Sequence, residues 1–298
     1  MAKSFVLQLA SLVTLIVSIP AFIVLLFSII NLKFPDAAQG VWEASSSQDS
    51  IRYTIAILVI FFPAYLVTTR LVNKARRQEG ELYHTLTKWL IYLALLIGGM
   101  VMLGDLAVVV YTFLNGEITV RFLLKAAVIL AVIGAAFYYY AADAKGYWQE
   151  REKQSLQLGG VALFLVLMAA VYGYYNIDAP GAVREMRLDE QQLMDLQDMQ
   201  WRIEAYYQET DSFPANLEDV YSDFPVPQAP EGREAYSYRI TGANTYELCA
   251  TFAAATPESQ RSIAKPIAEP GLNLNNYNWE HGAGKKCFSR TAPEVPTR

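Results

Sequence analysis

Four charged side chains within otherwise apolar sequence are the residues most able to do chemistry. Asp105 lies in GGMVMLGDLAVVVY, whereas Glu117, Arg121 and Lys125 lie at four-residue intervals in EITVRFLLKAAV. On a helix, residues four apart share one face. Charges within an apolar segment are costly, and they are usually paired or belong to ion and proton pathways. Two interpretations follow: a structural ion pair that locks two helices, or a proton relay, ion path or substrate site with Asp105 as the titrating group.

The spacing of these charges also predicts their depth. If the chain forms a helical hairpin that turns near Asn115, Asp105 lies ten residues before the turn and Lys125 ten residues after it. Both side chains would then lie about 15 Å from the turn. We therefore expect Asp105 and Lys125 to pair, with Arg121 nearer the helix end, where it can also reach the polar interface.

The only cysteines, Cys249 and Cys287, form an even pair without CxxC spacing. This pattern predicts one structural disulfide, with two free thiols as the alternative. A zinc site would add His281 to the two sulfurs, but the usual fourth protein ligand is not evident. The only other histidine is His84, so haem ligation is not expected either. We predict no metal and no cofactor.

Signals for catalysis and for nucleic-acid binding are weak. No nucleotide-binding loop is present, and no nucleophile stands in a recognisable arrangement around His281, so we expect no enzyme activity. From Ile177 onward the chain has 19 Asp and Glu against 11 Lys and Arg, a balance of −8, which disfavours a nucleic-acid partner. Acids such as Asp195, Asp198 and Glu204 are interpreted as a solvated helix face.

Five apolar stretches are each long enough to cross the roughly 30 Å of a bilayer core, which takes about 20 helical residues. They are Phe5–Leu32, Ile51–Val72, Trp89–Leu114, Val120–Ala142 and Leu158–Tyr175. The alternative for the first stretch is a cleaved signal peptide, but its apolar run is too long and it lacks a clear cleavage site. The sequence therefore predicts a multi-pass protein in contact with the lipid bilayer.

Loop charges predict the orientation, because Lys and Arg in short loops mark the cytoplasmic side. Basic residues cluster between the second and third stretches and between the fourth and fifth, whereas the other two loops have only acids. The basic residues are Arg70, Lys74, Arg76, Arg77, Lys88, Lys145, Arg151 and Lys153, and the acids are Asp36, Glu43, Asp49 and Glu117. We expect the N-terminus inside and the C-terminal domain outside, in a compartment where cysteines can oxidise.

The C-terminal part has the signals of a small α+β domain. Apolar positions at steps of three and four residues predict an amphipathic helix that ends at Pro214; they are Leu193, Leu196, Met199 or Gln200, Ile203 and Tyr207. YSYRIT, a GAN turn and YELCATF predict a β-hairpin. KKCFSR could then return beside YELCATF, where a Cys249–Cys287 bond would join the chain end to the sheet. The segment 256–278 is interpreted as a long loop, and TAPEVPTR as a disordered tail.

The membrane region resembles a known family. FPDAAQG, IRYTIAILVIFFPAYLVTTRLV, KWLIYLALLIGGMVMLGDLAVVVYTFLNGEITVRFLLK and AAFYYYAADAK are similar, in order and spacing, to a bacterial four-helix membrane family known as domain of unknown function 5671. The resemblance covers about residues 5–146. It implies a four-helix unit and a bacterial plasma membrane, but no activity.

The C-terminal part resembles another group of proteins. A membrane helix, an amphipathic helix, AYYQETDSFPANLEDV and a small antiparallel sheet are similar to the globular part of type IV pilins and type II secretion pseudopilins. True pilins begin with a short leader before this helix, whereas here the helix is the fifth predicted span, so only the fold is expected to carry over.

These observations predict an α-helical membrane protein with five transmembrane helices and a small extracytoplasmic α+β domain, an amphipathic helix plus an antiparallel sheet. The expected domains are a four-helix module (1–146), a cytoplasmic linker with the fifth helix (147–176) and the pilin-like domain with its tail (177–298). The predicted function is to present an interaction domain to a protein or cell-envelope partner, and oligomers are possible. The alternative is a small ion, proton or solute transporter that uses Asp105, Arg121 and Lys125.

Overall fold

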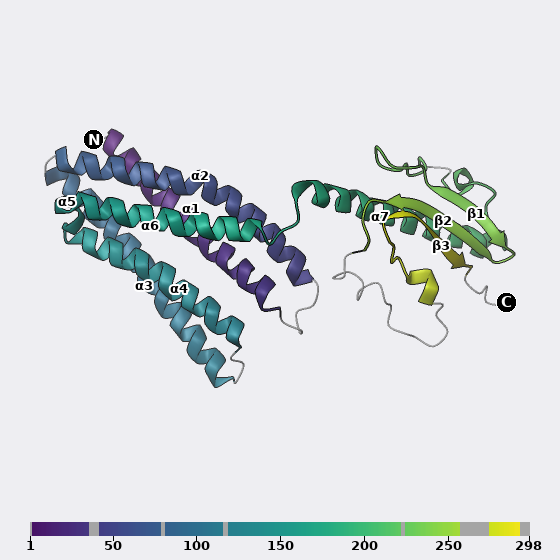
Figure 1. Cartoon of the computed structure of the whole chain (residues 1–298), viewed down its shortest axis with the longest axis horizontal. Coiled ribbons are helices and arrows are strands. Elements are labelled where there is room, and N and C mark those ends of the chain that lie inside the picture. Colours follow the sequence, from purple (N-terminus) through teal and green to yellow (C-terminus); the bar gives the residue numbers. More distant parts are fainter. Residues whose placement is uncertain are drawn as a thin grey trace. The chain divides into compact units, whose positions relative to one another are not determined.

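The computed structural model describes residues 2–35, 42–78, 81–115, 119–221, 224–256 and 274–292. The chain divides into two compact units, Met1–Ile177 and Asp178–Arg298 (Figure 1). Most of the long loop expected at 256–278, and the tail from Pro293, lie outside the described residues.

The first unit consists of helices. They are α1 (Ala2–Lys33), α2 (Trp42–Gln78), α3 (Glu81–Leu114), α4 (Val120–Ala144), the short α5 (Tyr147–Glu150) and α6 (Glu152–Tyr174). Five are long and apolar enough to cross a membrane: α1, α2, α3, α4 and α6. The predicted number of spans in the described chain is thus confirmed at the level of length and composition.

Helix α6 shares a core with α1 and α2. Leu25 of α1, Ile51 and Leu58 of α2, and Ala169 of α6 are buried in one cluster. Gly173 allows the close approach of these helices, because a Cβ there would lie 3.2 Å from side-chain atoms of both Leu25 and Ile51. The fifth span is therefore an integral part of the helical unit rather than a separate linker.

Helices α3 and α4 form the predicted hairpin, and α4 also contacts α1 (Figure 1). One boundary differs from the prediction. Helix α2 begins at Trp42, nine residues before the expected Ile51, so its first turns lie in what was read as an acidic loop. The polar stretch 43–50 is helical because Glu43 suits the positive end of a helix dipole and the following residues continue the same helix into the apolar span.

The second unit packs one long helix on a sheet. Its elements are α7 (Pro180–Thr210), η1 (Leu217–Val220), β1 (Ser237–Gly242), β2 (Thr245–Phe252), η2 (Leu274–Tyr277) and β3 (Gly284–Thr291). The strands form an antiparallel sheet in the order β1-β2-β3. Leu196, Met199 and Ile203 of α7 are fully buried against Tyr246 and Leu248 of the sheet.

These contacts confirm the amphipathic helix, the hairpin and the returning third strand. The predicted end of the helix at Pro214 is wrong, because α7 ends at Thr210. Asp211 adopts a left-handed conformation (φ 53°), and its N–H bonds to the carbonyl of Tyr207 at 2.8 Å, which ends the helix before the proline is reached.

Candidate functional site

Arg121 is positioned by the start of α4. The Thr119 hydroxyl accepts a 3.1 Å hydrogen bond from the backbone N–H of Phe122, so the helix begins at Val120 and Arg121 falls in its first turn. The side chain of Arg121 is buried, and its Nη1 donates to Oε2 of Glu43 at 2.7 Å. A second contact joins Nη2 to Oε1, so the two groups form a two-point ion pair between α4 and α2.

Sequence reasoning missed Glu43 because it placed this residue in an outer loop. The available signal was an acid close to the start of an apolar stretch, where a helix N-terminus would favour it. Glu117, the expected fourth member of the cluster, lies outside the described residues.

Lys125 lies one helical turn after Arg121 and turns toward α1. Its Nζ is 5.6 Å from the centroid of the Phe27 ring, a cation–π distance. No ion pair joins Lys125 to Asp105, although the structure describes both residues. The expected pairing is therefore not present.

The physical reason is that equal depth does not mean a shared helix face. Lys125 and Arg121 lie four residues apart on α4 and contact Phe27 of α1 and Glu43 of α2, whereas Asp105 belongs to another helix, α3. Asp105 is only partly exposed, and its Oδ2 is buried with no hydrogen-bond partner. Among the described members of the cluster, Arg121 thus pairs with Glu43, Lys125 lies over the Phe27 ring, and Oδ2 of Asp105 has no hydrogen-bond partner.

In the second unit, Asp189 of α7 carries the densest set of polar contacts. Its carboxylate accepts 3.0 Å hydrogen bonds from the backbone N–H groups of Ala253 and Ala254 and from Nη2 of Arg233. The side chain is only 7% exposed. These hydrogen bonds compensate for burying the Asp189 carboxylate. They also join α7 to the residues that follow β2.

The acids interpreted as a solvated face of α7 are also bonded inside the domain. Asp195 accepts from the Tyr236 hydroxyl at 2.6 Å, and Asp198 accepts from Tyr221 at 2.5 Å. Oε1 of Glu204 accepts from Gln200 at 2.7 Å. Burial raises the pKa of the Glu204 carboxyl, while Gln200 and Arg290 oppose that shift. Asp195 and Glu204 are thus half-buried and bonded within the domain, whereas the Asp198 side chain is bonded to Tyr221 and is still 42% exposed, as expected for a solvated face.

Arg290 of β3 lies beneath α7 and is almost fully buried. Its Nε donates to Gln200 at 2.7 Å, its Nη2 donates to the carbonyl of Asn278 at 3.0 Å, and its guanidinium lies 4.1 Å from the Trp279 ring. Burial lowers the pKa of Arg290 to about 10. The Arg290 guanidinium thus holds the segment before β3 against α7 through its hydrogen bonds and its contact with the Trp279 ring.

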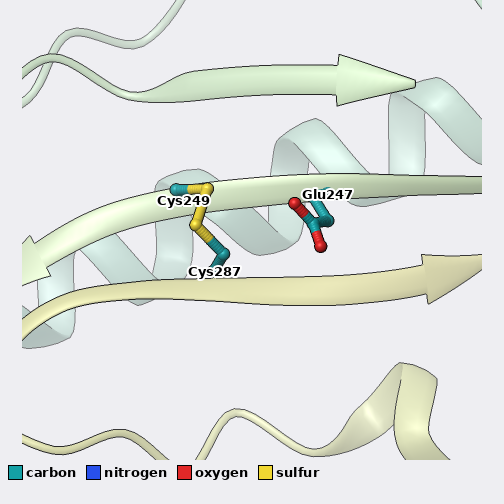
Figure 2. Close-up of side chains that lie close together, drawn as sticks. All are labelled: Glu247, Cys249 and Cys287. Carbon is teal, nitrogen blue, oxygen red and sulfur yellow. A yellow bond between two sulfur atoms is a disulfide. The ribbon is translucent and has the colours of Figure 1, made fainter. Parts of the chain in front are cut away.

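Cys249 and Cys287 face each other in the register of β2 and β3, with their Sγ atoms 2.08 Å apart in a disulfide. Figure 2 shows Glu247 beside them on the same side of the strands. The ligand atoms of these three residues lie within 4.8 Å of one another. Because the two sulfurs are bonded to each other, they offer no thiolate to a metal.

His281, weighed as a base or a zinc ligand, is instead packed in the core. Its ring stacks on Phe252 with 3.8 Å between centroids, and its backbone exchanges two 2.9 Å hydrogen bonds with Thr256. Burial lowers the pKa of His281. His84 belongs to α3, and its side chain lies outside the described residues.

Comparison with known proteins concerns the helical unit. Residues 4–140 match the family model described as Domain of unknown function (DUF5671). This DUF5671 segment contains α1, α2 and α3 and most of α4, and therefore Glu43, Asp105, Arg121 and Lys125. No curated protein and no solved structure matches the chain. The match leaves α6 and the second unit outside the segment and names no activity.

Proposed function

We propose that this protein anchors an extracytoplasmic α+β domain in a bacterial plasma membrane and presents it to a protein or cell-envelope partner. The observation that carries the proposal is the outer face of α7. Gln191, Met194, Gln197 and Trp201 follow one another at helical spacing on that face and are exposed and uncharged. The exposed fractions of Met194 and Trp201 are 58% and 66%.

This face stands out against the charge of the domain. The segment from Ile177 has a balance of −8, yet acids of α7 such as Asp189, Asp195 and Asp198 are engaged inside the domain. Trp and Met are enriched in protein interfaces, and exposed Trp residues are frequent hot spots. An exposed helix face that contains Trp and Met is suited to docking a partner.

Site-specific photo-crosslinking in living cells tests the proposal. A photo-reactive residue at Gln197 is expected to give a discrete adduct, and the added substitution Trp201→Ala is expected to reduce it severalfold. The matched control is the same probe at Ser289, which is exposed on the other side of the sheet from the helix. Equal adducts from both positions would contradict a role for the α7 face.

The pilin-like fold belongs to the same proposal. The packing of one long helix on a three-stranded antiparallel sheet supports it. What the proposal takes from the fold is a domain that displays a helix, without filament assembly.

One observation favours the alternative, a small ion, proton or solute transporter. Asp105 has a buried Oδ2 without a hydrogen-bond partner in an otherwise apolar helix, which is costly unless the group is protonated or binds a passing ion. Asp105→Asn distinguishes the two functions. Loss of flux in proteoliposomes with normal yield and thermal stability supports transport, whereas unchanged flux leaves the presentation of the second unit as the function.

A further inference from the structure

A groove of about 390 Å³ lies at the end of α4, where the chain turns through α5 toward α6. It is lined by Tyr138, Ala141, Ala142, Lys145, Gly146 and Tyr147. The small side chains of Ala141 and Ala142 leave space, and Tyr138 and Tyr147 provide aromatic surface beside it. The groove is separate from the charges of the DUF5671 segment discussed above.

The wall of the groove is held in place by packed aromatic residues. Trp148 is 3% exposed, stacks on Tyr139 with 5.1 Å between centroids, and donates from Nε1 to the Tyr139 carbonyl at 2.8 Å. Tyr147 packs edge-on against Trp148 at 4.8 Å. The groove is thus preformed, which lowers the conformational cost of binding a ligand.

One cation, Lys145, lines this groove, and a second, Arg151, lies against its Tyr147 wall. Lys145 is exposed and has no ion pair within the described part of the chain. The Arg151 guanidinium lies 4.3 Å from the centroid of the Tyr147 ring and donates to its hydroxyl. The nearest preceding acid, Asp143, is only 7% exposed. Glu152 next to Arg151 is exposed as well, so the positive charge at the groove itself is that of Lys145, which lies beside the two aromatic rings.

The position of the groove indicates its ligand. The candidate span of α4 ends at Ala144 and that of α6 begins at Glu152, so the groove lies where apolar helix surface meets polar chain. Tyrosines prefer this boundary, and basic pockets between membrane helices bind anionic lipid headgroups. We propose that this groove binds an anionic phospholipid, with its phosphate at Lys145 and Arg151 and an acyl chain along the apolar surface of α4.

Lipid retention by the full chain tests this site. The detergent-solubilised protein is exchanged into equal mixtures of phosphatidylglycerol and phosphatidylcholine, and retained lipid is counted by native mass spectrometry. We expect phosphatidylglycerol to be preferred, and Lys145→Gln to weaken its retention about fivefold, because one cation beside an anionic headgroup contributes about that much. Lys145→Arg should restore retention.

The matched control is Lys153→Gln, which removes an exposed cation in α6 that does not line the groove. A loss equal to that of Lys145→Gln would mean general surface charge and would overturn the proposal, as would equal retention of the two lipids. Inorganic phosphate and glycerol phosphate are added as competitors. Displacement of the lipid by either at millimolar concentration would assign the groove to a free anion instead.

Discussion

The guanidinium of Arg121 forms a two-point ion pair with the carboxylate of Glu43. The exposed fractions of the Arg121 and Glu43 side chains are 10% and 17%, so removing either charge breaks an ion pair that is largely shielded from water. We expect Arg121→Gln or Glu43→Gln to reduce the free energy of unfolding by about 3 kcal/mol. The double variant should lose less than the sum of the two. Thermal unfolding of the full chain in detergent measures the effect.

The control for this comparison of single and double variants is the Arg52–Asp49 pair, in which the Asp49 side chain is 65% exposed. Exposed pairs typically contribute about 0–1 kcal/mol, so Asp49→Asn should change the unfolding temperature little. Additive single effects at Arg121 and Glu43 would contradict direct coupling.

His281 is expected to make stability depend on pH. Burial lowers the pKa of its ring in the folded domain, whereas the unfolded value is about 6.5. Folding therefore favours the neutral ring, and this contribution is complete above that unfolded value and is lost as the pH falls through the lower, folded pKa. His281→Gln should flatten this loss of stability below neutral pH.

Hydrogen exchange of the β2 amides in the full chain, corrected for intrinsic rates and compared between wild type and variant, measures this effect. Burial raises the pKa of Glu204, so its stabilisation is lost as the pH rises and has the opposite slope. Glu204→Gln is therefore the control, and it should leave unchanged the loss of stability with falling pH that His281 causes. An unchanged slope in His281→Gln would show that another group is responsible.

For the charged residues of the spans, the sequence indicated how far each lies along its helix. It did not indicate which neighbouring helix each side chain faces. Asp105 and Lys125 lie at similar distances from the turn at Asn115, yet Lys125 contacts Phe27 and Asp105 does not pair with it. Helical spacing fixes which residues of one helix share a face. It does not fix which neighbouring helix that face meets, because this depends on packing of the whole unit.

Helix α6 comes closest to side chains of α1 and α2 at Gly173. Gly173→Val would place side-chain atoms within 3.2 Å or less of Leu25 and Ile51, so we expect a loss of about 1–3 kcal/mol from overpacking. Gly160→Val in the same helix is the matched control, since its Cβ would meet nothing within 4 Å. Thermal unfolding in detergent compares them, and equal losses would point to helix propensity instead of packing.

The elements of the second unit were more predictable than their ends. Alternating apolar residues and a short turn are local signals, so YSYRIT and YELCATF were expected as paired strands, and Cys249 lies opposite Cys287 as foreseen. The end of α7 depended instead on the backbone of Asp211, which an Asp residue adopts only in a minority of cases. In the first turn of α2, which begins at Trp42, Glu43 likewise pairs with Arg121, and local sequence patterns do not indicate a contact across 78 residues.

Considering the whole molecule, the sequence predicted five spans and placed the fifth helix, with the cytoplasmic linker before it, in a part of its own (147–176). Its burial between α1 and α2 became evident only from the packing of Ile51, Leu25 and Ala169. The five candidate spans form one helical body that includes α6 beyond the DUF5671 segment. We therefore expect the DUF5671 segment to need α6 for full stability in this chain.

The orientation of this body remains a prediction with a direct test. An odd number of crossings places the two ends of a chain on opposite sides, and the basic loops predict that the second unit lies outside. Alkaline phosphatase fused after Asn115 or after Arg298 should be active. A fluorescent protein fused after Gln78 or after Lys145 should fluoresce. The Cys249–Cys287 pair gives an independent readout, because it should resist alkylation in cells until a reductant is added. Phosphatase activity after Gln78 together with reduced cysteines would invert the topology, and with it the compartment in which the exposed face of α7 meets its partner.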